Sequence, residues 1–197
     1  MQMQLAALIV LAAAPMALWG EVKSTCERPL EARLQPGGKL RMDLKSADVE
    51  ITGGDASVIR VSCEMKNDSR AKEVAITFSG AGSFGDLRIY GGPTNDLHFR
   101  IEVPKNLNLF IRMPAGDLRL SGVTGDKDIE MHAGDLTISV GDPAAYRHAD
   151  ASVYAGDLNA GAFGATKDGL FRSFNKENAS GKYRLHAHLG AGDLILR

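Results

Sequence analysis

The stretch "MHAGDL" (131–136) decides the fold, because nearly the same letters occur three more times in the chain. The other copies are "MPAGDL" (113–118), "VYAGDL" (153–158) and "LGAGDL" (189–194), and "LKSADV" (44–49) is a looser fifth copy. A recurring Gly-Asp pair is compatible with a repeated metal site, a repeated catalytic acid or a repeated corner of the backbone. The pattern of apolar residues around the copies decides among these readings.

Apolar residues alternate on both sides of each copy, and the alternation changes parity across it. In the second copy they stand at Ile129 and Met131 before the Gly-Asp pair and at Leu136 and Ile138 after it. Such alternation is typical of a strand with one buried face, and an odd offset turns the next strand inside out unless the backbone bends. Gly tolerates positive φ and Asp accepts hydrogen bonds from nearby amides, so the pair supplies that bend. The predicted corner residues are Asp48, Gly116, Asp117, Gly134, Asp135, Gly156, Asp157, Gly192 and Asp193.

The spacing of the copies predicts how these strand-corner-strand units pack. From Asp117 to Asp135 is 18 residues, from Asp135 to Asp157 is 22, and from Asp157 to Asp193 is 36, which is two periods with a degenerate middle near "FRSFNKENASG" (171–181). A period of roughly 20 residues is that of a β-solenoid, in which each coil covers the open edge of the previous one. We therefore predict an all-β fold, namely a repeat-built parallel β-solenoid or β-helix with a less regular β N-terminal part.

The domain organisation follows from the rest of the chain. The unbroken apolar run "LAALIVLAAAPMALWG" (5–20) is shorter than a transmembrane helix of about 20 residues and predicts a signal peptide over residues 1–20, with a retained anchor as the alternative. Residues 21–197 are predicted to be a single β-strand-repeat domain, with 21–39 as an N-terminal lead-in. A small separate sandwich over 21–110 is the alternative. Within it, "DSRAKEVAI" (68–76) is expected to be a loop that enters a strand.

Charge and cysteine content limit the partners and the compartment. The 197-residue chain has a formal net charge of −1 with both signs interspersed, which gives no electrostatic argument for nucleic acid or an anionic membrane as a partner. Export would place the two cysteines, Cys26 and Cys63, in an oxidising compartment, so we expect a disulfide between them. A redox or metal thiol pair is the alternative, although the spacing is not CxxC. The expected location is the periplasm, the outer envelope or the exterior.

A family resemblance covers the repeat region. The segment "LHFRIEVPKNLNLFIRMPAGDLRLSGVTGDKDIEMHAGDLTI" (97–138) resembles the bacterial putative-adhesin family of unknown function, whose members repeat a small-Gly-Asp-aliphatic motif after a "VPxxxxLxI" segment. The resemblance extends from about Leu40 to Arg197 and implies an exported β-strand-repeat domain without an assigned activity. This chain has Ala where Ser is commoner before Gly-Asp, and "GLFRSFNKENASGKYRLHAH" (169–188) interrupts the rhythm.

The corner aspartates have a metal alternative. Stacked coils would place Asp117, Asp135 and Asp157 in one column about 5 Å apart. Like charges that close need satisfied carboxylates or an intervening cation, so a calcium ladder is the alternative to turn capping. Each repeat offers one carboxylate followed by Leu, however, whereas Ca²⁺ takes roughly six to eight oxygens. We expect the aspartates to cap the corners, and we expect no cofactor.

Two histidines offer a second metal alternative. His186 and His188 alternate in "HAH", so both are expected on one outward strand face. A surface zinc or copper site with a neighbouring acid is the alternative to a solvated polar face, and we expect no metal. Alignment of the corners places His188 in the column of Arg112, Glu130 and Ser152, and His186 in the column of Asp128 and Asp150.

An enzymatic role is the less favoured reading. A carbohydrate-active β-helix enzyme needs two carboxylates that face each other in a groove. The acids here recur at equivalent corners, which is typical of stacking, and the chain has no GxSxG, HExxH, P-loop or dinucleotide motif. We therefore expect no catalytic residues.

The favoured function is that of an exported, non-catalytic cell-envelope protein, an adhesin-like surface or scaffold that binds protein or glycan. The alternatives are a carbohydrate-active β-helix enzyme and a periplasmic accessory protein in envelope stress signalling. Uncovered strand edges at the terminal coils would favour self-association. Exposed aromatic residues would mark the binding surface, and the candidates are Tyr154, Phe171, Phe174 and Tyr183.

Overall fold

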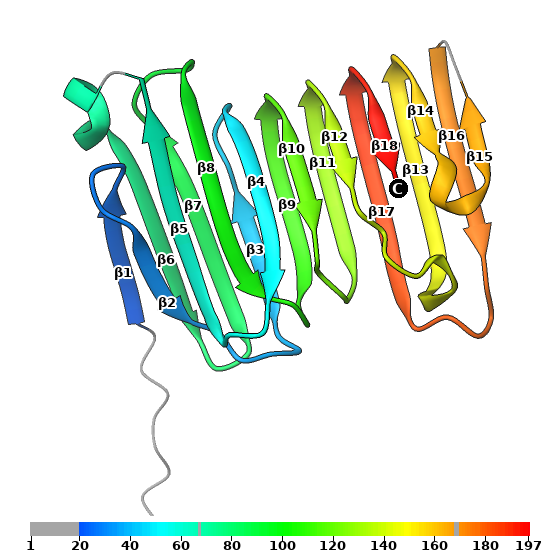
Figure 1. The fold of residues 1–197 in the computed structure, drawn as a ribbon, viewed down its shortest axis with the longest axis horizontal. Helices are drawn as coiled ribbons and strands as arrows, with labels where there is room; N and C mark the ends of the chain where they lie inside the picture. Colours follow the sequence, from blue (N-terminus) through cyan, green and yellow to red (C-terminus); the bar gives the residue numbers. More distant parts are fainter. Residues whose placement is uncertain (1–19, 67, 168–169) are drawn as a thin grey trace, which may run out of the picture.

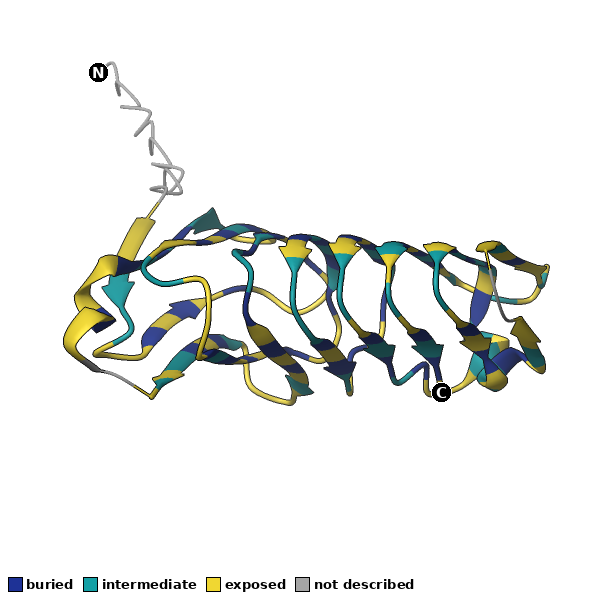
Figure 2. Ribbon diagram, turned by 90° about the horizontal axis from the view of Figure 1, so that it is seen from above, coloured by how far each residue is buried: buried dark blue, intermediate teal, exposed yellow. Residues whose placement is uncertain are grey.

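The computed structural model describes residues 20–66, 68–167 and 170–197, so all of the predicted signal peptide except Gly20 lies outside the described residues. Two large mixed sheets lie face to face with the core between them (Figures 1 and 2). The all-β prediction is therefore confirmed. Within the described part of the chain, no helix is long and apolar enough to span a bilayer. The short turns of 3₁₀ helix are η1 (Asp68–Glu73), η2 (Pro143–Ala145) and η3 (Gly161–Phe163).

Sheet I has nine strands. Its six central strands, from β7 to β13, pair in parallel, whereas β1, β6 and β16 pair antiparallel at its ends. In order across the sheet, the strands are β1 (Gly20–Thr25), β6 (Val74–Ala81), β7 (Phe84–Gly91), β3 (Lys39–Asp43), β9 (Asn108–Ala115), β11 (Lys127–Ala133), β17 (Tyr183–Ala191), β13 (Tyr146–Ala155) and β16 (Leu170–Glu177).

Sheet II also has nine strands, again parallel in the middle and antiparallel at both ends. The predicted parallel pairing thus holds for the central strands only. The 68–76 segment is a 3₁₀ turn that enters β6, where a loop was expected. In order across sheet II, the strands are β15 (Ala165–Lys167), β14 (Leu158–Ala160), β18 (Leu194–Leu196), β12 (Leu136–Ile138), β10 (Leu118–Ser121), β4 (Asp48–Gly54), β8 (Leu97–Pro104), β5 (Val58–Met65) and β2 (Leu30–Arg33).

Each Gly-Asp copy lies where the chain passes from sheet I to sheet II. The glycines there have φ between +111° and +135°, a region that side-chain-bearing residues rarely adopt. They also pack tightly, because a Cβ atom on Gly134 would lie 2.0 Å from the carbonyl oxygen of Gly116, and one on Gly192 would lie 1.9 Å from that of Gly134. Glycine is therefore required twice over, by its φ and by the closeness of the next corner.

The corner units do not stack in sequence order. The unit β17–β18, drawn in red in Figure 1, lies between β11–β12 and β13–β14. Leu189 is the register partner of Met131 on one side and of Val153 on the other. The prediction of a degenerate coil near 171–181 is wrong, because residues 170–177 form β16, the antiparallel edge strand of sheet I. Sequence spacing did not reveal this order because all the corners have the same local geometry, and each can pack on any other.

The core is one continuous cluster whose side chains change along the molecule. The end formed by β1 to β8 buries large residues such as Phe78 and Phe99. Towards the other end, buried strand positions are held by small residues such as Ala149, Ala151 and Ala187. The two sheets therefore share one interior, to which β13 and β17 contribute several alanines.

The two cysteines are joined as expected. Cys26 follows β1 and Cys63 lies on β5, with 5.0 Å between their Cα atoms and a sequence separation of 37. The bond therefore links the edge of sheet I, through the segment after β1, to sheet II.

Candidate functional site

Polar side chains form two rows across the outer face of sheet I. In one row, His188 lies between Glu130 and Ser152. Alignment of the repeated corners within the sequence grouped these residues correctly, although it did not place β17 between β11 and β13. His188 Nδ1 lies 2.8 Å from Ser152 Oγ, which makes a hydrogen bond across the two strands.

In the second row, His186 lies between Asp128 and Asp150. His186 Nδ1 lies 2.5 Å from one Asp150 carboxylate oxygen, and His148 Nε2 lies 3.1 Å from the other. The second nitrogen of His148 lies 2.6 Å from Glu177. The sequence analysis missed His148, although it shares the parity of Asp150 on the same strand. Glu177 was not foreseeable in this way, because it belongs to the antiparallel strand β16.

The acids of these rows are engaged by cationic or imidazole groups. Arg112 donates from Nη1 to Asp128 Oδ1 at 2.7 Å, and its Nε lies 3.1 Å from Glu130 Oε2. Asp150 is held between His148 and His186. Among the residues that the structure describes, no three His, Cys, Asp or Glu side chains are arranged to hold a metal ion.

A hollow of about 390 Å³ lies beside the second row, and Lys127 is one of the residues that line it. Lys127 is 1% exposed, and its Nζ donates to the carbonyl oxygen of Gly125 at 3.1 Å and to Tyr146 Oη at 2.7 Å. Tyr146 Oη in turn donates to the carbonyl oxygen of Val140 at 3.2 Å. Burial lowers the pKa of Lys127 to about 8 and raises the pKa of Tyr146 to about 12. The sequence analysis missed this pair, although Lys127 has the parity of the buried residue Ile129.

The corner aspartates form a column outside the core. The amide of Asp193 donates to the carboxylate of Asp135, and the amide of Asp157 donates to the carboxylate of Asp193, each at 3.3 Å. Asp117 instead accepts from Arg119 at 3.4 Å. The prediction that Asp135 and Asp157 are successive members of the column is wrong, because the β17–β18 unit places Asp193 between them. The stacking order is Asp48, Asp117, Asp135, Asp193, Asp157.

The four aromatic candidates divide into two groups. Tyr154 and Phe171 are 57% and 68% exposed, and their rings meet edge to face with centroids 4.6 Å apart. Phe174 is buried and lies 5.2 Å from the ring of Phe163, and Tyr183 is half-buried against the core. Alternation explains the division, because Phe174 has the opposite face parity to Phe171 on β16. Two of the four residues thus lie on an accessible surface and two belong to the interior.

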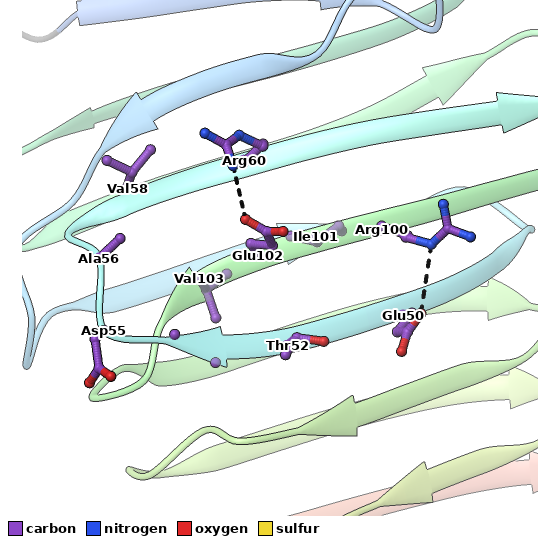
Figure 3. Close-up of a pocket in the computed structure, with 12 residues that line it drawn as sticks. Glu50, Thr52, Asp55, Ala56, Val58, Arg60, Arg100, Ile101, Glu102 and Val103 are labelled. Carbon is purple, nitrogen blue, oxygen red and sulfur yellow. Dashed lines mark hydrogen bonds and ion pairs between the residues drawn. The ribbon is translucent and has the colours of Figure 1, made fainter.

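A second hollow, of about 500 Å³, lies on the outer face of sheet II over β4, β5 and β8 (Figure 3). Arg60 Nη1 lies 3.3 Å from Glu102 Oε2, and Arg100 Nε lies 3.9 Å from Glu50 Oε2. Gly53 and Gly54 leave part of its lining without side chains. No sequence motif predicts this hollow, because it depends on which strands pair. In the sequence, both arginines occupy ordinary outward positions of strands.

Terminal strands lie where self-association was expected. Sheet I ends in β1 and β16, and sheet II ends in β2 and β15. β16 carries the exposed residues Leu170 and Phe171. The two ends of the molecule therefore differ, and the more apolar edge belongs to the end with the aromatic pair.

Comparison with known proteins gives a likeness of fold. The chain matches no known family and no curated protein. Its structure is similar to a solved structure from Clostridium sporogenes that is described as a "putative cell adhesion protein", with a TM-score of 0.54. The two sequences are 12% identical, and the match covers 86% of this chain and 99% of that one. At this identity, the likeness shows a shared fold alone.

Proposed function

We propose that this chain is an exported, non-catalytic cell-envelope protein that binds protein or glycan through its outward strand faces, as an adhesin-like surface or scaffold. The observation that carries the proposal is the pair of exposed aromatic rings, Tyr154 and Phe171, on a broad polar sheet face. Exposed aromatic residues amid polar side chains are typical of recognition surfaces. The fold shared with a protein described as a cell adhesion protein supports the same reading.

Export is supported by the disulfide between Cys26 and Cys63, which suits an oxidising compartment. We propose that residues 1–20 are the signal peptide and that the mature chain acts in the periplasm, in the outer envelope or outside the cell. We also propose that 21–197 is one domain, in which the lead-in 21–39 provides the strands β1 and β2. The single core cluster supports that unity.

We infer that the parallel corner units are coils of a β-solenoid with a period of roughly 20 residues. The unbroken backbone hydrogen bonds from corner to corner support this reading. The backbone amide of Leu118 donates to the backbone carbonyl oxygen of Asp135. In the same way, the amide of Leu136 donates to the carbonyl oxygen of Asp193 and that of Leu194 to the carbonyl oxygen of Asp157, at 2.8 to 2.9 Å. In this reading, the antiparallel strands at both ends cover the first and last coils.

A carbohydrate-active enzyme is the second candidate, favoured by one arrangement. Asp128, His186 and Asp150 are neighbours on three adjacent strands beside a hollow. Two carboxylates on either side of a bound sugar are what hydrolysis requires. Each of these carboxylates is already engaged, however, by Arg112 or by imidazoles, which favours a structural role. Reducing-sugar release by the wild type that is lost in Asp150→Asn would establish the enzyme instead.

The binding role is tested with the purified exported chain and envelope fractions separated into protein and glycan, with and without EDTA. We expect saturable binding that EDTA does not change. Loss of binding in EDTA would favour the calcium ladder at the corner aspartates. Binding to a single envelope protein, with no binding to glycan or to cells, would favour the accessory role in stress signalling. Absence of binding to every fraction would contradict the proposal.

A further inference from the structure

A glycine interrupts a row of outward side chains on sheet I beside the exposed aromatic pair, and we call the resulting gap the notch. The register partners Met131, Leu189 and Val153 lie next to one another on β11, β17 and β13. The residues that follow them, His132, Gly190 and Tyr154, therefore form one row across the outer face, with Phe171 of β16 beyond Tyr154. Because Gly190 has no side chain, the row is interrupted between the imidazole and the phenol.

The width of the notch is set by strand spacing. Neighbouring strands lie about 4.8 Å apart, so His132 and Tyr154 stand about 10 Å apart across β17. A flat six-membered ring fits against one of the two side chains in that space. A Cβ atom at Gly190 would lie 2.4 Å from the carbonyl oxygen of His132, so the backbone packing itself keeps this position without a side chain.

Tyr154 and Phe171 form the aromatic side of the notch, and Phe171 has an unfavourable backbone conformation there. Phe171 has φ of +55°, which is unusual for a large L-residue. Backbone of this kind persists where the surroundings impose it and is concentrated at functional positions. Here it sets the Phe171 ring edge to face with Tyr154, at 4.6 Å, although both rings remain more than half exposed. Packing of the core does not account for two such exposed rings.

Polar groups lie next to the notch along the same strands. Two residues before His132, Gly190 and Tyr154 on the same face are Glu130, His188 and Ser152, about 7 Å away. Ser152 and His188 form a hydrogen bond that is open to solvent on its outer side, and Glu130 is paired with Arg112. The surroundings thus offer neutral donors and acceptors beside an aromatic face, with the nearby charge compensated.

We propose that this notch binds one pyranose ring of a neutral glycan. The apolar C–H face of the sugar would stack on Tyr154, its edge would face His132, and its hydroxyl groups would bond with Ser152 and His188. An apolar face surrounded by hydroxyls is the chemistry that such a combination of aromatic and polar groups recognises. The inference rests on the proposed binding function and names its ligand class.

The test compares three variants of the exported chain. Tyr154→Ala removes the stacking face, and Phe171→Asn removes its support while tolerating the positive φ. Tyr90→Ala is the matched control, because Tyr90 is 54% exposed on β7 of the same sheet, away from the notch. Each protein is titrated by calorimetry with the β-1,4-linked tetramers of glucose and of N-acetylglucosamine, with a mannose tetramer, and with the envelope glycan fraction.

We expect Tyr154→Ala to weaken glycan binding by about tenfold or more, Phe171→Asn to weaken it less, and Tyr90→Ala to leave it unchanged. Equal glycan affinities of Tyr154→Ala and the wild type would overturn the notch as the binding site, and the proposed binding function would then have to reside on another part of the outward strand faces. Binding of the wild type to envelope protein but to no glycan would also overturn it. If Tyr154→Ala instead abolished self-association measured by ultracentrifugation, with glycan binding unchanged, the patch would be a contact between two copies. A wild type that binds no envelope fraction would remove both proposals together.

Discussion

The two halves of the molecule build the same pair of sheets by different means. Strands β1 to β8 include long hairpins such as β6–β7, carry the disulfide, and bury large side chains. Strands β9 to β18 rely on parallel ladders between glycine corners and bury many alanines. The first half therefore carries the covalent bond between the sheets, whereas the second contains the column of closely packed glycine corners.

The looser corner at 44–49 differs from the glycine corners of the second half. Its Ala47 lies at the end of the column, where the other copies have glycine. A Cβ atom on each corner glycine would point at the carbonyl of the preceding corner, from Gly116 to Ala47, from Gly134 to Gly116, and onwards. Ala47 does not have the positive φ of the corner glycines, and the strand on the other side of β4 is β8 rather than part of a Gly-Asp unit, so its methyl group is tolerated. Glycine is thus required at the stacked corners, where φ is positive and the neighbouring corner lies close by.

Substitution of a stacked corner glycine should break the second half. Gly192→Ala combines a φ of +126° with a Cβ position 1.9 Å from the carbonyl oxygen of Gly134, so we expect a loss of more than about 3 kcal/mol of unfolding free energy. The control is Gly141→Ala, which has φ of +75° and open space around it, and which should cost about 1 kcal/mol. Urea denaturation measures both, and equal losses would contradict the stacking argument.

Removal of the disulfide should weaken the first half selectively. Cys26→Ala with Cys63→Ala opens a loop with a sequence separation of 37, which we expect to cost about 3 to 4 kcal/mol. Hydrogen exchange followed by mass spectrometry should show faster exchange in β1, β2 and β5 than in β11, β17 and β13. Uniform loss of protection over the whole chain would mean that the two halves unfold as a single unit.

The buried Lys127 should make stability rise with pH in the second half. The pKa of its ammonium falls from its ordinary value to about 8 in the folded protein, so the unfolded chain binds more protons above that pH. Unfolding free energy should increase from about pH 8 up to about pH 10, by at most about 3 kcal/mol. Above pH 10 the raised pKa of Tyr146 acts in the opposite direction, because the unfolded phenol ionises first. Lys127→Met should flatten the rise between pH 8 and pH 10 in thermal unfolding, and an unchanged rise would assign it to another group.

Outer-face ion pairs should matter least in both halves. Arg112→Met removes the contacts with Asp128 and Glu130 on partly exposed side chains, and we expect a loss below about 1 kcal/mol. Arg60→Met, on the first half, should leave the unfolding midpoint unchanged. A large effect of either substitution in thermal melts would show that the polar rows contribute to stability as well as to the surface.

The sequence carried the local geometry of the repeats but not their spatial order. The parity change around "MHAGDL" predicted a corner, and the cross-strand groups of His186 and His188 followed from aligning the corners. The insertion of β17 between β11 and β13 did not follow, because equivalent corners make many stacking orders equally compatible with the pattern. The notch at Gly190 depends on that insertion, since it places a residue without a side chain between His132 and Tyr154. Long-range pairing, rather than periodicity, creates this site.

The inserted unit also bears on how the protein is made. Residues 183–196, which form β17 and β18, leave the ribosome after β13 to β16, yet they separate β11 from β13 in the finished fold. Until they arrive, neither β11 nor β13 can pair with β17, and their matching corners favour a premature contact between them. The second half therefore completes its folding only after these late residues are free to enter.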